Sequence, residues 1–474
     1  MHTRWLPLDI APWSLFRALA RKERPFLVDA GQPWGNEWVS SMGFRPRMQF
    51  RIAAGDTADP LAALDAALGP LAPGARAASH PVPFAGGAVV ALAYELKNAL
   101  ERLPQTQIED ANAPHLLVAI YDAVVAYDHR RHAYLVASWH LDDAALARYA
   151  EEVLDAAAAV AVEAPGTRRR DEDRGVATAV PLAITTNLDP GEYARRVERI
   201  RAYIAAGDVY QVNLSMRLRA PLGGEALDLY SNLRAAQPVP FGGYFDLGPA
   251  QVLSNSPELF LRRRGERIET CPIKGTRRRG QTSAEDARLA AELRADPKER
   301  AEHVMIVDLE RNDLGRVCRT GSVRVGRFAE LVSFRTLHHL VSTVQGSLPP
   351  DVTGGELLHA TFPGGSVTGA PKIRAMQIID EVERGPRGFY TGALGWIDAS
   401  GDLDLNVAIR TAVATGSTLT YHAGSAIVAD SRPEREHAES LLKAEAFLRA
   451  FGAMTSPPAA TAGDRLSELG GRVS

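Results

Sequence analysis

The segment YTGALGWIDASGDLDLNVAIRTAVATGSTLTYHAGSAIV, residues 390–428, decides the fold class of this chain. It contains three strand-like runs, Tyr390–Ile397, Leu403–Val413 and Leu419–Val428, separated by short turns that contain Gly and Ser. Consecutive strands joined by such short turns must be antiparallel. The segment therefore predicts an α+β fold built on large antiparallel β-sheets with helices outside, and it excludes a doubly wound parallel sheet.

Four predicted helices accompany these strands. Asp189, Pro190 and Glu192 indicate a capping box with Pro at the first helical position, and the helix that they begin ends at Gly207. The spacing of apolar residues indicates the other three, over residues 299–312, 371–385 and 433–451. Further strands are predicted at Tyr121–Tyr127, Ala133–Trp139, Val252–Ser256, Leu259–Arg262 and Ile268–Ile273.

Composition excludes several classes of protein. The chain has 474 residues, of which 46% are apolar, and its formal net charge of −3 gives no electrostatic reason to bind nucleic acid or an anionic membrane. Two cysteines exclude a disulfide scaffold or a Cys-rich metal site and fit a reducing compartment. The longest apolar run, Val153–Val162, is too short to cross a bilayer, and we recognise no signal peptide. We expect a cytoplasmic protein.

The chain divides into four predicted parts. Residues 1–163 mix strands and helices, and residues 164–182 are read as an exposed linker because they combine Pro, Gly and a mixed charge cluster. Residues 183–452 are dense in predicted structure. The final part, residues 453–474, is rich in Pro, Ala, Ser and Gly and is predicted to be a flexible tail.

Two pairs of carboxylates are candidates for a metal site. Glu299 and Glu302 are three residues apart on one predicted helix, and Glu436 and Glu439 have the same spacing on another. Residues at this spacing share a helix face, and two such pairs facing each other would suit Mg²⁺, which prefers oxygen ligands. On spacing alone, two solvated helix faces are the commoner explanation.

Glu258 and Lys274 flank a predicted hairpin. A turn centred on residue 266 would place them directly opposite each other, whereas a two-residue turn would shift the register and separate them. Burial would favour the neutral, nucleophilic amine of Lys274, and Glu258 would then be a candidate general acid or base. A cross-strand salt bridge is the alternative explanation.

The glycine-rich run Phe362–Lys372 leads into a predicted helix, whose N-terminal amides attract anions. It differs from a phosphate-binding P-loop because Ala370-Pro371-Lys372 replaces the required Lys-Ser/Thr pair. A carboxylate site and a merely tight loop are both compatible with the run, and a nucleotide is not expected. Polar residues near other element ends add candidates: His339, Ser342, Tyr390, Arg410 and Lys443.

Four segments in this order resemble one family of enzymes: Pro272–Thr276, Ala301–Asp313, Phe362–Met376 and Ala423–Ser431. The sequence is similar to the chorismate-utilising enzymes, which include anthranilate synthase component I, aminodeoxychorismate synthase component I, and the isochorismate and salicylate synthases. The resemblance is strong from about residue 183 to 450 and weak before it. It implies large antiparallel sheets packed face to face, with helices outside.

Position 274 indicates the branch of the family. The residue between Ile273 and Gly275 is typically Ala in anthranilate synthases and Lys in aminodeoxychorismate synthases, and here it is Lys274. The resemblance implies that the chain converts chorismate and ammonia to 4-amino-4-deoxychorismate, on the route to p-aminobenzoate and folate. The alternatives are anthranilate synthesis and isochorismate or salicylate synthesis.

The same resemblance assigns chemical roles to the candidate residues. Lys274 would form a covalent adduct at C2 of chorismate as the 4-hydroxyl leaves, with Glu258 as general acid and base. Arg410 would hold a substrate carboxylate. The whole substrate-binding set is Thr276, His339, Ser366, Tyr390, Arg410, Gly424, Ser425 and Lys443.

The implied cofactor is Mg²⁺, with two kinds of carboxylate around it. Glu302 and Glu439 would bind the metal directly. Glu299 and Glu436 would act through metal-bound water. The metal would hold the ring carboxylate of chorismate.

The two cysteines bear on the source of ammonia. A glutaminase needs an activated Cys on a sharp turn, and neither Cys271, in a strand before Pro272, nor Cys318 has that setting. We therefore expect a separate glutamine amidotransferase partner that supplies the ammonia.

The N-terminal part departs from the family at one element. The family's tryptophan-binding element often reads Leu-Leu-Glu-Ser, and the comparable stretch here is Phe26-Leu27-Val28-Asp29. Because of this difference, the resemblance does not imply that tryptophan inhibits this protein.

Overall fold

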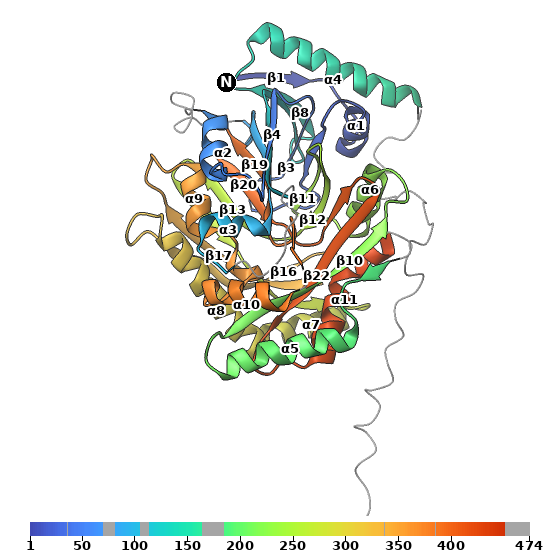
Figure 1. Cartoon of the computed structure of the whole chain (residues 1–474). Helices are drawn as coiled ribbons and strands as arrows, with labels where there is room; N and C mark the ends of the chain where they lie inside the picture. The colour runs from blue at the N-terminus through green and yellow to red at the C-terminus, as the bar shows by residue number, and fades with distance from the viewer. Residues whose placement is uncertain are drawn as a thin grey trace, which may run out of the picture.

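Two antiparallel sheets form the centre of the computed structural model, which describes residues 1–35, 37–69, 81–104, 113–163, 184–335, 337–383 and 385–450. The predicted linker at 164–182 and the predicted tail at 453–474 lie outside these residues. Figure 1 shows the N-terminal elements at the top, with α1 and α4, and the helices α5 and α7 at the bottom.

Twelve strands make the larger sheet of the described chain. In spatial order they are β1 (His2–Leu6), β8 (Ala133–Ser138), β7 (Ala123–Asp128), β3 (Val39–Gly43), β2 (Phe26–Asp29), β11 (Phe241–Asp246), β12 (Gln251–Ser256), β21 (Thr411–Thr415), β22 (Thr418–Ile427), β10 (Gln211–Pro221) and β18 (Gly369–Ala370), and β9 (Thr185–Thr186) also pairs with β10.

Ten strands make the smaller sheet of the described chain. In spatial order they are β15 (Ile273–Arg278), β17 (Leu337–Ser347), β14 (Arg267–Cys271), β13 (Leu259–Arg264), β20 (Leu403–Val407), β19 (Ala393–Asp398), β5 (Gly87–Leu92), β6 (Pro114–Tyr121) and β4 (Met48–Ala53), and β16 (Arg324–Ser333) also pairs with β17. Both sheets thus combine strands from residues 1–163 with strands from residues 184–450.

The sheets pack face to face through apolar side chains from both. Phe26, Phe245 and Val252 of the larger sheet meet Leu394 and Trp396 of the smaller in one buried cluster. Helices cover the outer faces, so the predicted α+β arrangement is confirmed. The helices are α1 (Pro12–Leu19), α2 (Pro60–Leu68), α3 (Lys97–Leu100), α4 (Asp143–Glu163), α5 (Pro190–Ala205), α6 (Ala226–Ala236), α7 (Ser283–Ala295), α8 (Pro297–Gly315), α9 (Gly354–Thr361), α10 (Lys372–Val382) and α11 (Pro433–Ala450), with short 3-10 turns η2 (Tyr94–Leu96) and η3 (Gly365–Val367).

The helix ends confirm the local sequence signals. At α5 the Glu192 N–H donates to Asp189 Oδ1 at 2.7 Å and the Glu192 side chain accepts from the Asp189 N–H, which completes the predicted capping box. Helix α8 begins two residues before the predicted start, because Asp296 caps it by accepting from the N–H groups of Lys298 and Glu299.

The predicted strand Leu403–Val413 is wrong as a single element. It divides into β20 and β21, which belong to different sheets, and Arg410 lies at the division with a φ of 51°. The chain changes sheet in the same way where β12, in the larger sheet, continues through Pro257 and Glu258 into β13, in the smaller sheet. Alternating apolar residues alone do not show this change of sheet, because both halves keep strand character.

The predicted direct pairing of Glu258 with Lys274 is also wrong. Gly265 and Glu266 form a two-residue turn, because Arg264 pairs with Arg267 in the register of β13 and β14. Lys274 lies on the next strand, β15, which pairs with β17. The two-residue turn shifts the register by one, which is the alternative that the sequence left open.

A buried ion pair joins the N-terminal part to α10 and gives a test of this packing. Lys97 Nζ lies 2.7 Å from Asp380 Oδ2, with the two side chains 1% and 8% exposed. We expect Lys97→Met to lower the free energy of unfolding by about 3–5 kcal/mol, because it leaves a buried carboxylate without its ammonium partner. Lys97→Met combined with Asp380→Leu should lose much less, and urea denaturation that finds equal losses would contradict the prediction.

Candidate functional site

Ser366 brings the two predicted catalytic residues together. Its carbonyl oxygen accepts a hydrogen bond from Lys274 Nζ at 3.2 Å, and its hydroxyl bonds to the carboxyl group of Glu258. Glu258 is 4% exposed, and its Oε1 also accepts from the Ile273 N–H at 3.4 Å. The lysine and the carboxyl group thus meet through the glycine-rich loop rather than through a hairpin register.

Burial shifts both groups toward their neutral forms. It raises the pKa of the Glu258 carboxyl, and the Ser366 hydroxyl and the Lys274 charge only partly oppose this. It also lowers the pKa of the Lys274 ammonium, against the attraction of Glu302. A neutral amine is the nucleophilic form of lysine, and a protonated carboxyl can act as an acid.

Arg410 and His339 form a second group beside this pair. Arg410 Nη2 donates to His339 Nε2 at 3.5 Å, while His339 Nδ1 donates to the Gly275 carbonyl at 3.2 Å and lies 3.1 Å from Thr276 Oγ1. Burial and then the Arg410 charge lower the pKa of His339 to about 3, so the ring is neutral. Arg410 Nη1 is buried without a partner, as expected for a guanidinium that binds an anion.

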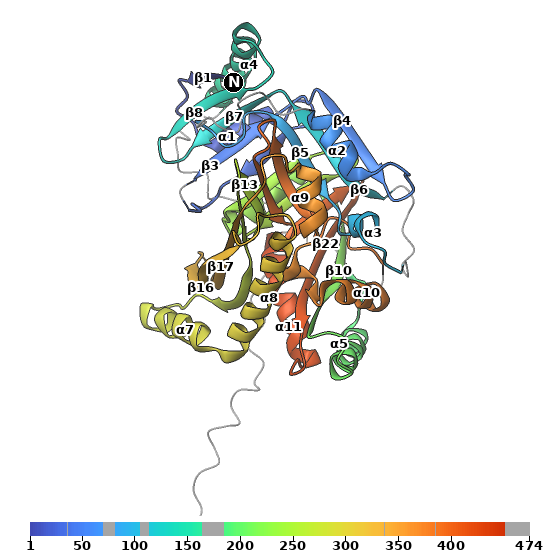
Figure 2. The same cartoon turned by 90° about the vertical axis from the view of Figure 1, so that its left-hand side faces the viewer.

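Three of the four predicted metal-binding carboxylates influence one another. The charge of Glu439 on α11 raises the pKa values of Glu299 and Glu302 on α8, on which burial has the largest effect. Figure 2 shows α8 in the middle of the lower half, with β16 and β17 on one side and α11 on the other. Lys274 and Lys443 lie in the same electrostatic neighbourhood.

The carboxylates do not form a ligand cluster in this conformation. Each is paired with its own cation: Glu299 with Arg277 at 3.4 Å, Glu302 with Lys298 at 3.7 Å, and Glu439 with Lys443 at 2.7 Å. Within the described ranges, no group of three or more His, Cys, Asp or Glu side chains could hold a metal ion. The donor atoms are all carboxylate oxygens, which is the chemistry that Mg²⁺ prefers.

Two further predicted site residues are buried and contact hydroxyl groups. Glu436 Oε1 accepts from the Ser431 hydroxyl at 2.7 Å, and the side chain is buried. The Ser425 hydroxyl lies 3.0 Å from the Tyr193 hydroxyl, which also contacts Ser440. Neighbouring strand residues point to opposite faces, so Ser425 and Gly424 do not share a side of β22.

The remaining predicted residues lie along β22 and its neighbours. Lys443 Nζ donates to the Gly424 carbonyl at 3.1 Å. A side chain on Gly424 would place its Cβ 2.4 Å from the Leu214 carbonyl, so only glycine fits there. Tyr390 is buried and stacks on His422 with ring centroids 5.2 Å apart.

The sequence reasoning missed two polar residues on β10. Asn213 Nδ2 donates to the Ser366 carbonyl at 3.1 Å, beside the Lys274 bond. Gln211, on the same face of the strand two residues earlier, is fully buried, and neither of its amide atoms has a partner. The alternation of polar and apolar residues from 211 to 217 is the signal that indicates this polar face.

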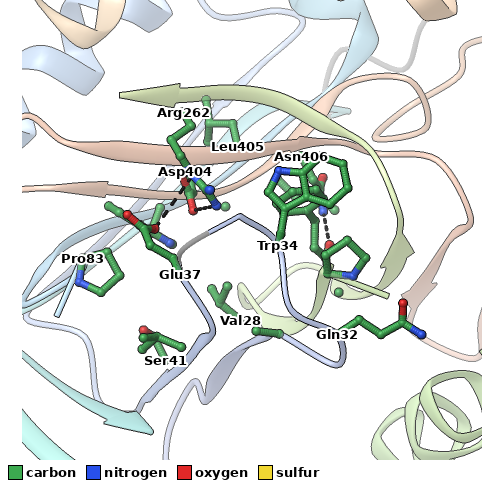
Figure 3. A pocket seen from close by; sticks show the side chains of 18 of the residues that line it. Val28, Gln32, Trp34, Glu37, Ser41, Pro83, Arg262, Asp404, Leu405 and Asn406 are labelled. Atoms are coloured by element: carbon green, nitrogen blue, oxygen red, sulfur yellow. Dashed lines mark hydrogen bonds and ion pairs between the residues drawn. The ribbon is translucent and has the colours of Figure 1, made fainter. Parts of the chain in front are cut away.

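Figure 3 shows a separate cavity. It is lined by residues of the N-terminal strands β2 and β3 and by residues of β11, β13, β19 and β20. It has a volume of about 50 Å³, and Val28, from the stretch compared with the tryptophan-binding element, lines it. Glu37 reaches Arg264, and Arg262 makes two 2.8 Å hydrogen bonds to Asp404 in its wall. None of the residues predicted to bind chorismate or metal lines this cavity.

The fold agrees with comparisons to known proteins. The family model of chorismate binding enzymes matches residues 23–449. The chain belongs to this family and is therefore an enzyme that acts on chorismate. Within the described residues, the structure contains no helix with the length and apolar character of a membrane span.

Two relatives and one solved structure show how similar this chain is to members of the family. The chain is 39% identical over 375 residues to aminodeoxychorismate synthase component 1 of Bacillus subtilis, a match that covers 79% of this chain and 78% of the relative. It is 39% identical over 468 residues to anthranilate synthase component 1 of Streptomyces coelicolor, covering 95% and 88%. The structure of anthranilate synthase component I from Streptococcus pneumoniae superposes with a TM-score of 0.73 at 30% identity, covering 87% of this chain and 93% of that one.

The environment of Lys274 predicts unusual reactivity toward an amine-directed reagent. Because burial lowers its pKa, we expect the pH midpoint of its modification to lie below that of the same lysine in the urea-unfolded chain. Peptide mass spectrometry over a pH series measures the midpoint of each lysine separately, whatever its access to the reagent. The same midpoint for Lys274 in the folded and unfolded chains would contradict the prediction.

Proposed function

We propose that this chain converts chorismate and ammonia to 4-amino-4-deoxychorismate. The observation that carries the proposal is the ε-amino group of Lys274, which lies partly buried and held at the Ser366 carbonyl beside the Glu258 carboxyl group. The resemblance of Pro272–Thr276 to the aminodeoxychorismate branch, and the similarity to its member from Bacillus subtilis, support it.

The proposed reaction proceeds in two substitutions on the ring. The neutral amine of Lys274 adds to C2, the ring double bonds shift, and the C4 hydroxyl leaves as water with a proton from Glu258. Ammonia then adds to C4, the double bonds shift back, and the lysine amine leaves C2. Glu258 takes up the proton that the incoming ammonia releases, so the net change is chorismate plus ammonia to the amine plus water.

Arg410 and its neighbours supply the binding of the substrate carboxylates. The unpaired Nη1 of Arg410 is available to a carboxylate, and its neutral partner His339 does not compete as an anion would. Lys443, held at Gly424, adds a second cation near the carboxylates of α8 and α11. We also include Tyr390, which is buried and stacks on His422, among the proposed substrate-binding residues.

We include Mg²⁺ in the proposal, with Glu302 and Glu439 as direct ligands and Glu299 and Glu436 in supporting positions. The metal would supply positive charge for a substrate carboxylate. The mutual influence of Glu299, Glu302 and Glu439 supports this, because a cation would relieve the repulsion among them.

A separate glutamine amidotransferase is proposed as the ammonia donor. Burial raises the pKa of the Cys271 thiol to about 12 and that of the Cys318 thiol to about 11. Both side chains are therefore thiols rather than nucleophilic thiolates near neutral pH, which disfavours glutamine hydrolysis by this chain itself.

Anthranilate synthesis is the alternative, because many similar relatives carry that name. Chorismate, Mg²⁺ and ammonium incubated with the chain, with the product identified by mass and retention, distinguish the two. Anthranilate as the product would overturn the proposal, and turnover without any nitrogen donor would indicate isochorismate or salicylate synthesis instead.

Replacement of Lys274 tests the covalent step. We expect Lys274→Ala to abolish formation of 4-amino-4-deoxychorismate, because no other amine lies at the Ser366 carbonyl among the contacts described. Glu258→Gln should lower kcat by about 10²- to 10⁴-fold, as expected for loss of a general acid. Lys22→Ala, far along the chain in a pair with Glu152, is the matched control. Wild-type rates for Lys274→Ala would exclude the adduct.

The metal proposal has a test that does not depend on turnover. Mg²⁺ should raise the Tm of the wild-type chain, because a ligand that binds only the folded state stabilises it by mass action. The variants Glu302→Gln and Glu439→Gln should lose most of this increase, whereas Glu152→Gln should keep it. An equal increase in all four proteins would contradict the assignment of these ligands.

A further inference from the structure

Beneath the Ser366 loop, α8 carries a buried carboxyl group that the proposed mechanism does not use. Glu310 is 3% exposed, and its Oε1 accepts a hydrogen bond from the Gly365 N–H at 3.0 Å. A Cβ on Gly365 would lie 2.5 Å from Leu309 Cδ2 and 3.2 Å from Glu310 Oε1, so the loop backbone rests directly on the helix. The position of Gly365 relative to α8 is therefore determined by the close packing on Leu309 and by the hydrogen bond to Glu310.

We propose that Glu310 is a positioning residue for Lys274 and Glu258, acting through the backbone of Gly365 and Ser366. The inference rests on the proposed roles of these two residues. Ser366 follows Gly365 directly, its carbonyl accepts from Lys274 Nζ, and its hydroxyl bonds to Glu258. A displacement of Gly365 moves both contacts at once.

A second set of contacts holds the start of the glycine-rich loop, so that loss of Glu310 need not unfold it. Asp313, one turn after Glu310, pairs with the ammonium of Lys372, which also donates to the carbonyls of Thr361 at 3.0 Å and Pro363 at 2.9 Å. The start of the loop is thus held without Glu310. Loss of the Glu310 carboxyl should loosen residues 365 and 366 without releasing the whole segment.

The charge state of Glu310 indicates the right replacement. Burial, followed by the charge of Asp313, raises its pKa to about 8, so the group is largely protonated at neutral pH. Its carbonyl oxygen then accepts from Gly365, as the side-chain oxygen of Gln would. Met has a similar length, is compatible with a buried site and provides no such acceptor.

Kinetics of two replacements test the proposal. Glu310→Met should lower kcat for chorismate consumption by about 10- to 100-fold with little change in KM, because small misplacements of reacting groups cost this much. Glu310→Gln should restore most of kcat. Val307→Ala, a cavity-forming change on the same helix, should lower Tm but keep kcat.

The pH midpoint of Lys274 modification gives a readout that loss of stability alone does not change. It should fall in Glu310→Met, because the lysine loses a carbonyl that favours its charged form, and stay constant in Glu310→Gln and Val307→Ala. Wild-type kcat with an unchanged midpoint in Glu310→Met, or equal damage by Gln, would overturn the proposal. Anthranilate as the wild-type product would overturn the proposed function but leave these comparisons intact, because consumption and modification do not depend on which product forms.

Discussion

Two strands that pass from one sheet into the other impose the constraint on which the site depends. β12 continues into β13 at Glu258, and β20 continues into β21 at Arg410. The crossings are hydrogen-bonded to each other, because the Val407 N–H donates to the Glu258 carbonyl and the Asn255 N–H donates to the Arg410 carbonyl, both at 3.0 Å. The positive φ of Arg410 costs on the order of 1–3 kcal/mol, which the paired crossings must offset.

The interior near these crossings favours neutral groups. Burial is the largest effect opposing charge on Glu258, Lys274 and His339, and nearby cations add to it at Lys274 and His339. Hydrogen bonds to Ser366 and Gly275 hold the three side chains in place. The fixed cation Arg410 remains charged beside them because guanidinium has a very high intrinsic pKa. The result places the proposed nucleophile and the proposed acid in the same interior as a guanidinium whose Nη1 has no hydrogen-bond partner.

Local signals in the sequence predicted the elements well but their pairing less well. The capping box of α5, the helices that carry Glu299, Glu302 and Glu439, and the strands near residue 260 follow from caps, spacing and turns. The change of sheet at Arg410 was missed, since both halves of the run alternate in the same way. The residue that pairs with Glu258 depends on whether the turn near residue 266 has two or three residues, and the amino-acid composition of the turn does not decide this.

The sequence by itself determined the antiparallel class, the helices and the identity of the chemical groups, because these depend on neighbours close in the chain. Only the tertiary structure decided which groups meet. It places Ser366 between Lys274 and Glu258, pairs Glu436 with Ser431 and Ser425 with Tyr193, and brings Asn213 to the same carbonyl as the lysine. The contacts of Lys274 and Asn213 with Ser366, and of Tyr193 with Ser425, join residues 92 to 232 positions apart, and no local pattern encodes a contact over that separation.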